Sequence, residues 1–234
     1  RIANFVLGHY MGLKNRLKDK IELVLICAGS EGDASRTVAE LNDFAYVECA
    51  NEPLSQKHNA LYVKAREYSP DACIKIDSDS ILTEEFFLWY DDLINEGVDY
   101  AGIEDVYFLF KRRAYYWGGY KGMRSGEPTG VGRFMSRRLL EMLGWMPWGS
   151  LNANDAFDIN MTRRIDALGD VVVRRMIKCA DVNGLCIDLK SDVNISPLHL
   201  FEFDSAVETA EFGIDFSYLE PVLLDWEPEK KNKA

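Results

Sequence analysis

Two aspartates one residue apart, Asp77 and Asp79, follow an apolar run in the segment "CIKIDSDSIL". Ile74 and Ile76 give that run the composition of a buried strand, and like charges this close resist burial unless a cation lies between them. Hard cations such as Mg²⁺ and Mn²⁺ take oxygen ligands, with water and phosphate oxygens filling the remaining positions. The pair therefore predicts a metal site. The alternative is a solvated turn with an aspartate cap for a helix that starts near Thr83.

The elements that must position these aspartates alternate along the first hundred residues. This alternation predicts an α/β fold with a mostly parallel central sheet flanked by helices. Ligands bind such sheets at the carboxyl ends of the strands, which is where Asp77 and Asp79 are expected, so the architecture favours a ligand site over a solvated cap. The expected strands are residues 2–8, 21–29, 45–49, 72–77 and 98–104, and the expected helices are residues 34–44, 55–69 and 83–97.

The second half of the chain has a different character. Residues 106–128 combine aromatics, four glycines and five cations, which predicts a mobile lid whose rings stack on a sugar or base and whose cations meet phosphate. The alternative is an irregular surface hairpin. Residues 129–145 read as a glycine turn, a short strand and a helix that starts near Ser136. Residues 154–170 read as a helix with acidic residues in its first turn and Gly169 at its end.

Length and composition bound the class of protein. The 234 residues fit one domain over residues 1–225, with a nucleotide-binding half (1–105), an acceptor and lid half (106–225) and a polar tail (226–234). The net charge of −11 disfavours nucleic acid or an anionic membrane surface as the main partner, without excluding a nucleic acid acceptor. Five cysteines without a CxxC pair indicate reduced core residues of a cytoplasmic protein. No apolar run reaches the roughly 18 residues of a membrane span.

Four segments in this order resemble metal-dependent glycosyltransferases of the GT-A fold, nearest to the family 2-like group. "KHNALYVKAREYSPDACIKIDSDS" resembles the family's asparagine-containing helix and the strand that ends in its DxD motif. "TGVGRFMSRRLLEML" is similar to the glycine, strand and Ser-Arg helix segment near the sugar. "NDAFDINMTRRIDALG" resembles the acidic motif that supplies the base, and "SPLHLFEF" resembles the segment with a late metal-binding histidine. The resemblance covers about residues 1 to 200 and rests on order and spacing.

The resemblance implies transfer of a sugar from a nucleoside-diphosphate sugar, UDP-linked or GDP-linked, to a carbohydrate or other hydroxyl acceptor. It implies an inverting reaction with an aspartate base, although retaining enzymes share the DxD motif. In the chemistry of this reaction, Mn²⁺ or Mg²⁺ neutralises the leaving diphosphate. The implied metal ligands are Asp77, Asp79 and His199; the implied base is Asp158, with Asp155 in reserve; and the implied donor-binding residues are Gly8, Lys57, Asn59, Asp77, Arg124 and Gly130.

Each of these roles has a structural alternative. His199 stands between two leucines and can be a packed core residue, and Asp155 and Asp158 can be helix N-terminal acids favoured by the dipole. The chain also departs from the family pattern. Phe157 stands where a glutamate is usual, and residues 27–30 lack the aspartate that grips the base, for which Glu31 or Asp33 can substitute.

Other classes of protein share parts of these patterns. In a haloacid-type phosphohydrolase Asp77 would be the nucleophile and Asp79 the acid, but the later segment "GDVVVRR" lacks the second acid of that class. A sugar nucleotidyltransferase needs a glycine-rich loop after the first strand, which "LGHYMGLKN" matches poorly. A calcium-binding EF-hand loop is excluded, because Leu82 and Leu88 occupy its glycine and glutamate positions. A catalytically inactive carbohydrate-binding relative remains a non-enzymatic alternative.

Overall fold

The computed structural model describes residues 1–111, 113–154, 157–192 and 201–226, and within them the chain is an α/β protein, as predicted. The helices are α1 (Ile2–Leu17), α2 (Asp33–Leu41), α3 (Leu54–Ala65), α4 (Glu84–Asn95), α5 (Arg137–Met142), α6 (Phe157–Asp166) and α7 (Cys179–Val182). The strands are β1 (Ile26–Gly29), β2 (Ala45–Glu48), β3 (Ala72–Lys75), β4 (Ser80–Leu82), β5 (Tyr100–Ile103), β6 (Val106–Leu109), β7 (Ala114–Trp117), β8 (Arg133–Ser136), β9 (Arg174–Ile177), β10 (Cys186–Leu189) and β11 (Ser205–Val207).

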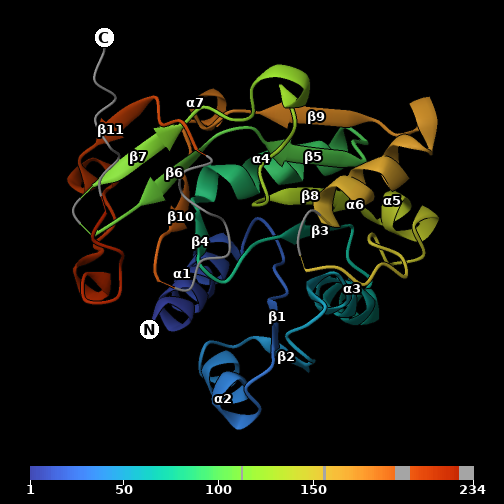
Figure 1. The fold of residues 1–234 in the computed structure, drawn as a ribbon. Coiled ribbons are helices and arrows are strands. Elements are labelled where there is room, and N and C mark those ends of the chain that lie inside the picture. Colours follow the sequence, from blue (N-terminus) through green and yellow to red (C-terminus); the bar gives the residue numbers. More distant parts are fainter. Residues whose placement is uncertain (112, 155–156, 193–200, 227–234) are drawn as a thin grey trace.

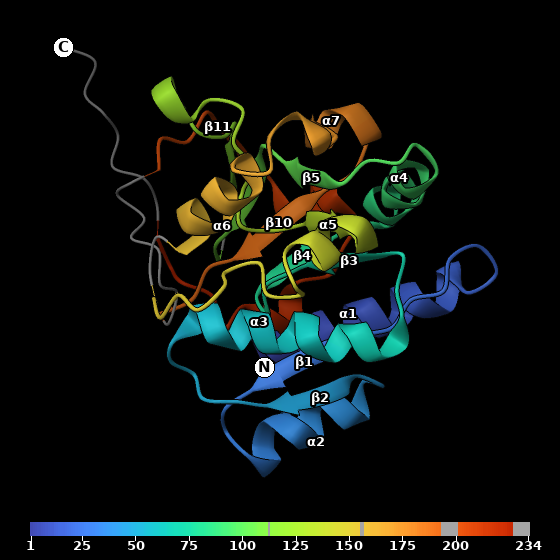
Figure 2. The same cartoon turned by 90° about the vertical axis from the view of Figure 1, so that its right-hand side faces the viewer.

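The described strands form three sheets. A four-stranded sheet has the order β3-β8-β5-β9, a five-stranded sheet has the order β11-β7-β6-β10-β4, and β1 pairs with β2 alone. The β1–β2 pair and α2 lie at one end of the molecule, beyond α1 and α3 (Figures 1 and 2). The chain passes from the four-stranded to the five-stranded sheet between β3 and β4, and Asp77 and Asp79 occupy that connection.

The sheets are mixed, and the expected mostly parallel central sheet is not seen in the described part of the chain. Five of the eight strand pairings described there are antiparallel. Two of the five belong to β8, which follows the glycine turn and inserts antiparallel between β3 and β5, and the other three lie in the five-stranded sheet. Strands β6 and β7 lie between β5 and β8 in the chain, so β8 reaches its place through a long connection that local sequence patterns do not reveal.

The strand expected at residues 2–8 is wrong, because these residues begin helix α1. The buried residues of α1 continue to Leu17 at helical spacing, and they include Val6, Tyr10 and Leu13. A mostly apolar window of seven residues does not separate a short strand from the start of a longer helix. Gly8 therefore lies within a helix instead of at the end of a strand.

The lid expected over residues 106–128 is wrong for its first half. Strands β6 and β7 form a regular antiparallel hairpin inside the five-stranded sheet, so the alternative of an irregular surface hairpin is also wrong there. Phe108, Phe110 and Trp117 are buried, and Phe108 lies 4.7 Å from Phe201 between ring centroids. The aromatic side chains thus build core, and only residues 118–128 follow an irregular path.

Two apolar clusters cover the two faces of the four-stranded sheet. On one face, α4 contributes Phe86 and Tyr90, and the Tyr90 ring stacks on Phe134 of β8 at 5.8 Å. On the other face, α5 and α6 contribute Leu139, Leu140, Met161 and Ile165. Because both faces are packed, the ends of β3 and β8 are held in fixed positions.

Several local predictions are confirmed. The helices expected at 34–44, 55–69 and 83–97 are α2, α3 and α4. Ser136 caps α5, since its hydroxyl accepts a hydrogen bond from the Leu139 N–H at 3.1 Å. The helix expected before Gly169 is α6, which ends at Asp166, and Gly169 follows with a positive φ of 71° that favours glycine. All five cysteines are free.

Candidate functional site

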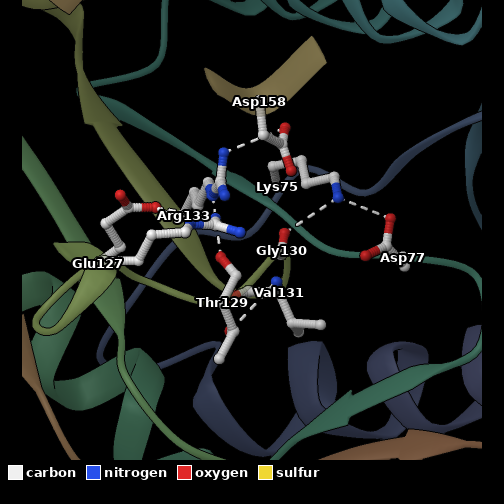
Figure 3. A network of polar contacts seen from close by, with 9 residues as sticks. Lys75, Asp77, Glu127, Thr129, Gly130, Val131, Arg133 and Asp158 are labelled. Atoms are coloured by element: carbon white, nitrogen blue, oxygen red, sulfur yellow. Dashed lines mark hydrogen bonds and ion pairs between the residues drawn. The ribbon is translucent and has the colours of Figure 1, made fainter. Parts of the chain in front are cut away.

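The candidate site is built on the turn at residues 129–132, where β3 ends and β8 begins. Lys75 closes β3, Arg133 opens β8, and the two are register partners. Lys75 Nζ donates to the Gly130 carbonyl at 2.9 Å, and Arg133 Nε donates to the Thr129 carbonyl at 2.9 Å (Figure 3). Lys75 and Arg133 therefore both bind the turn at residues 129–132 through hydrogen bonds.

Each of these cations also holds a carboxylate. Lys75 Nζ lies 2.6 Å from Asp77 Oδ1, and Arg133 Nη1 lies 3.0 Å from Asp158 Oδ1 (Figure 3). The cationic side chains are 8% and 5% exposed, whereas those of Asp77 and Asp158 are 35% and 31% exposed. The cations thus lie beneath the surface and the carboxylates face outward.

Gly130 lies where the two carboxylates converge. A Cβ atom at this position would lie 3.7 Å from Asp77 Oδ2 and 4.0 Å from Asp158 Oδ2, with Lys75 Nζ also at 4.0 Å. These are ordinary contact distances and Gly130 has no positive φ, so no backbone strain requires a glycine there. What glycine provides is access, because a ligand can approach the main chain between the two acids.

A second acidic group adjoins the first. Asp188 of β10 is the register partner of Ser80, and Lys190 Nζ lies 2.7 Å from Asp188 Oδ2. Lys190 is 3% exposed and its ammonium lies 4.4 Å from the Phe108 ring centroid. A buried lysine beneath a more exposed aspartate repeats the pattern of Lys75 and Asp77.

Burial and mutual repulsion shift the pKa values of these acids. Burial first, and then the charge of Asp79, raises the pKa of Asp188 to about 7 against the opposing effect of Lys190. Burial and the charge of Asp77 raise the pKa of Asp79. Burial also acts to raise the pKa of Asp77, but the charge and hydrogen bond of Lys75 outweigh it, and that pKa is lowered. Asp77 is thus the acid most firmly held as a carboxylate.

These groups line a cleft of about 2210 Å³. Its wall on the α3 side includes Lys57 and His58, and burial, followed by the charge of Lys75, lowers the pKa of His58 to about 4. On the opposite rim, the Arg124 guanidinium lies 3.6 Å from the Tyr120 ring centroid. A neutral imidazole, an aromatic ring and two cations therefore surround the acidic floor.

Comparisons with known proteins do not place this site in a family. No protein-family model matches the chain, and no curated protein matches it at a significant level. The function therefore has to be argued from the geometry of the cleft.

The structure brings together most, but not all, of the residues expected at the site. Asp77, Asp79, Asp158, Lys57, Arg124 and Gly130 all line the cleft. Asp155 and His199 lie outside the described residues. Neither Gly8 nor Asn59 is among the residues that line the cleft.

Gly8 and Asn59 were expected to contact the donor, but their side of the chain packs against other parts of the protein. A Cβ atom on Gly8 would lie 3.4 Å from Asn42 Oδ1, so this face of α1 packs toward α2. Asn59 is 2% exposed, donates to the Gly149 carbonyl at 2.8 Å and accepts from the Trp148 N–H at 3.2 Å. Its amide joins α3 to the loop before α6 instead of reaching a ligand.

Sequence reasoning missed the cations beneath the acids. Lys75 interrupts an apolar run, and a lysine inside a buried strand needs a counter-ion, which is a usable signal for the pair with Asp77. The segment "CIDLK" carries the same signal for Asp188 and Lys190. Arg133 gives no such local signal, because its partner Asp158 lies on a different element.

The described residues contain no group of three histidine, cysteine or acidic side chains arranged to hold a metal ion. Asp77 and Asp79 nevertheless provide carboxylate oxygens at the edge of a cleft, next to an Asp188 oxygen that is inaccessible and accepts no hydrogen bond from the described residues. Magnesium is commonly held by one or two carboxylates, with substrate phosphates and water completing its shell. The two DxD carboxylates fit a cation of that kind.

No helix in the described ranges has the length and apolar character needed to cross a membrane.

Proposed function

We propose that this protein is a GT-A-type glycosyltransferase that moves a sugar from a nucleoside-diphosphate sugar to an acceptor hydroxyl. The observation that carries the proposal is the convergence of Asp77 and Asp158 on Gly130 at the floor of the cleft. Asp77 follows strand β3 as the first acid of the DxD segment, and Asp158 lies in the first turn of helix α6. Sugar transfer needs two groups side by side: one that holds the metal and its diphosphate, and a base for the acceptor hydroxyl.

The charge of the cleft explains why a divalent cation belongs to the proposal. The acids Asp77, Asp79, Asp158 and Asp188 outnumber the buried cations Lys75, Arg133 and Lys190, and each of these cations already has a carboxylate partner. A diphosphate adds further negative charge, so its approach to Asp77 and Asp79 is favoured by a cation between them, in addition to the charges of Lys57 and Arg124 on the cleft walls. Asp77 and Asp79 would hold Mn²⁺ or Mg²⁺, which neutralises the leaving diphosphate as a Lewis acid when bound.

Asp158 is the proposed general base. Its Oδ1 is held by Arg133, while its Oδ2 lies toward Gly130, where a ligand can approach. The N-terminal turn of α6 stabilises a negative charge on this side chain. An acceptor hydroxyl that reaches Asp158 Oδ2 can pass its proton to the carboxylate as the oxygen attacks the sugar.

The remaining lining residues suit a nucleotide sugar. Lys57 stands on the α3 wall, held by a hydrogen bond to Asn51 Oδ1 at 3.0 Å, and is placed to meet a phosphate or ribose. The stacked pair of Tyr120 and Arg124 on the opposite rim offers an aromatic face and a guanidinium to a sugar or base. UDP-linked and GDP-linked sugars are both compatible with these contacts.

Release of free nucleoside diphosphate from a panel of UDP-sugars and GDP-sugars, with and without Mn²⁺, tests this function. The expected result is turnover of at least one donor that depends on the metal and accelerates when a carbohydrate acceptor is added. Binding of nucleoside diphosphate measured by calorimetry provides a second readout that needs no acceptor. Failure of every donor both to bind and to react would overturn the proposal.

A further inference from the structure

Arg133 is buried beneath Asp158, on a different element from it, and no sequence signal connects the two. We infer that Arg133 is a positioning residue for the transfer step, fixing Asp158 so that one carboxylate oxygen faces the space above Gly130. This inference rests on the proposed function, because it assigns a role within the same reaction. Its physical basis is the geometry around the guanidinium.

One side of the Arg133 guanidinium binds a main-chain carbonyl, and another side faces Asp158. Arg133 Nε is occupied by the Thr129 carbonyl at 2.9 Å, which fixes the plane of the side chain. Arg133 Nη1 lies 3.0 Å from Asp158 Oδ1, yet neither atom has an aligned hydrogen bond to the described residues, and both are inaccessible to solvent. The contact is a Coulomb pair that holds Oδ1 beneath the surface and leaves Asp158 Oδ2, on the Gly130 side, to accept a hydrogen bond from a ligand.

A second Arg–Asp pair, next to the same sheet, shows what a purely structural arrangement looks like in this protein. Asp99, immediately before β5, is 2% exposed and accepts hydrogen bonds from Arg138 Nε, Ser136 Oγ and the Val173 N–H, each at 2.9 Å. Its partner Arg138 is 54% exposed. In that pair the acid is buried, and both of its oxygens accept hydrogen bonds from other residues of the protein.

The Arg133–Asp158 pair has the opposite polarity. Its cation is 5% exposed and its acid is 31% exposed. Burying a guanidinium to present a carboxylate costs desolvation energy that a stability role does not require. The cost is understandable if the presented acid must keep one orientation while a substrate replaces the water around it.

Lys75 provides a contrast at the neighbouring position. It is the register partner of Arg133, but it holds Asp77, on the donor side of the cleft. Loss of Lys75 is therefore expected to change donor binding, whereas loss of Arg133 is expected to change the transfer step. The two cations can be separated experimentally because each pairs with a different carboxylate.

A double-mutant cycle with Arg133→Met and Asp158→Asn tests the inference. Single-turnover transfer from a saturating donor should fall about 10²-fold in Arg133→Met, with the KM for donor nearly unchanged, and Arg133→Lys should recover part of the loss. In the Asp158→Asn background, Arg133→Met should cost less than about threefold, because the group it positions has already lost its basicity. Lys75→Met should instead raise the KM for donor, and to a similar degree in both backgrounds.

Arg138→Met is the matched control, since it breaks an Arg–Asp pair that lies next to the same sheet and does not line the cleft. It should lower the melting temperature without a comparable loss in the transfer rate constant. Equal losses from Arg133→Met with and without Asp158→Asn, in a wild-type protein that transfers sugar, would reject the positioning role alone. A wild-type protein that neither binds nor turns over any donor would reject the proposed function, and this role with it.

Discussion

Lys75 and Arg133 face each other at the adjoining ends of β3 and β8, and each binds a carboxylate that belongs to a different part of the chain. Lys75 holds Asp77, two residues along the same segment, while Arg133 holds Asp158 at the start of α6. Both side chains also bind carbonyls of the 129–132 turn. This relationship explains how the DxD segment and the helix α6 come to face one cleft, and it leads to the following predictions.

Asp79→Ala should abolish metal-dependent donor turnover. The main-chain hydrogen bond from the Leu189 N–H to the Asp79 carbonyl, at 2.8 Å, does not involve the side chain, so the fold should persist. The expected loss is on the order of 10²-fold or more, as for removal of a metal ligand at a Lewis-acid site. Titration of Mn²⁺ binding by electron paramagnetic resonance, alongside the turnover rate, checks both parts. Wild-type turnover in this variant would show that the site assignment is wrong.

Asp158→Asn should retain donor affinity and lose transfer by roughly 10²–10⁴-fold, the usual contribution of a general base. The substitution preserves the shape of the side chain beside Arg133 but removes its basicity. Asp155→Asn, a change outside the described residues, should cost much less. Calorimetric donor binding and single-turnover rates on both variants decide between them. A severe loss only in Asp155→Asn would move the base, and retention of anomeric configuration in the product would exclude this role for both residues.

The loop at residues 118–128 should be protected by a bound nucleotide. Arg124 and Tyr120 line the cleft, and Lys121 and Met123 are exposed, so trypsin should cut after Lys121 and Arg124 in the free protein. Nucleoside diphosphate with Mn²⁺ should slow both cleavages several-fold if the loop closes over the ligand. Cleavage after Lys18, at the exposed end of α1, serves as the control. Identical rates with and without ligand at all three positions would argue against a lid.

Asp99 should make the fold sensitive to acid. Burial acts to raise the pKa of its carboxyl, but hydrogen bonds from Arg138, the Val173 N–H and Ser136 outweigh it, so that pKa is lowered in the folded state. A lowered pKa contributes stability that is complete above the unfolded value of about 3.9 and is lost as the pH falls below it.

Asp99→Asn should accordingly lower the free energy of unfolding by roughly 2–3 kcal/mol at pH 7. The difference from wild type should shrink as the pH falls below the unfolded value of about 3.9, because protonation removes the charge that these hydrogen bonds stabilise. Urea unfolding monitored by tryptophan fluorescence at pH 7 and at pH 3 measures both quantities. A constant difference across this range would mean that the Asp99 charge does not contribute to stability.

The local part of the site could be predicted from sequence, and the supporting part could not. Asp77 and Asp158 stand beside strong local signals, an apolar run ending at an acid and an acidic first turn of a helix, and both line the cleft. Asn59 and Gly8 were expected there on resemblance alone, but Asn59 is used by internal hydrogen bonds and Gly8 lies in α1. Whether Asp79 binds a metal and Asp158 acts as a base stays a prediction.

The sequence by itself determined the α/β class, helices α2 to α6 with the Ser136 cap and Gly169 end, and the acids at the ends of their elements. These features depend on interactions within a few residues, which periodicity and capping express directly. Tertiary structure alone decided that residues 2–8 belong to a helix, that the aromatic hairpin at 106–117 is core, and that β8 inserts antiparallel beside β3. Strand pairing and burial depend on partners far along the chain, and Arg133 meets Asp158 because that pairing brings the first residue of β8 beneath α6.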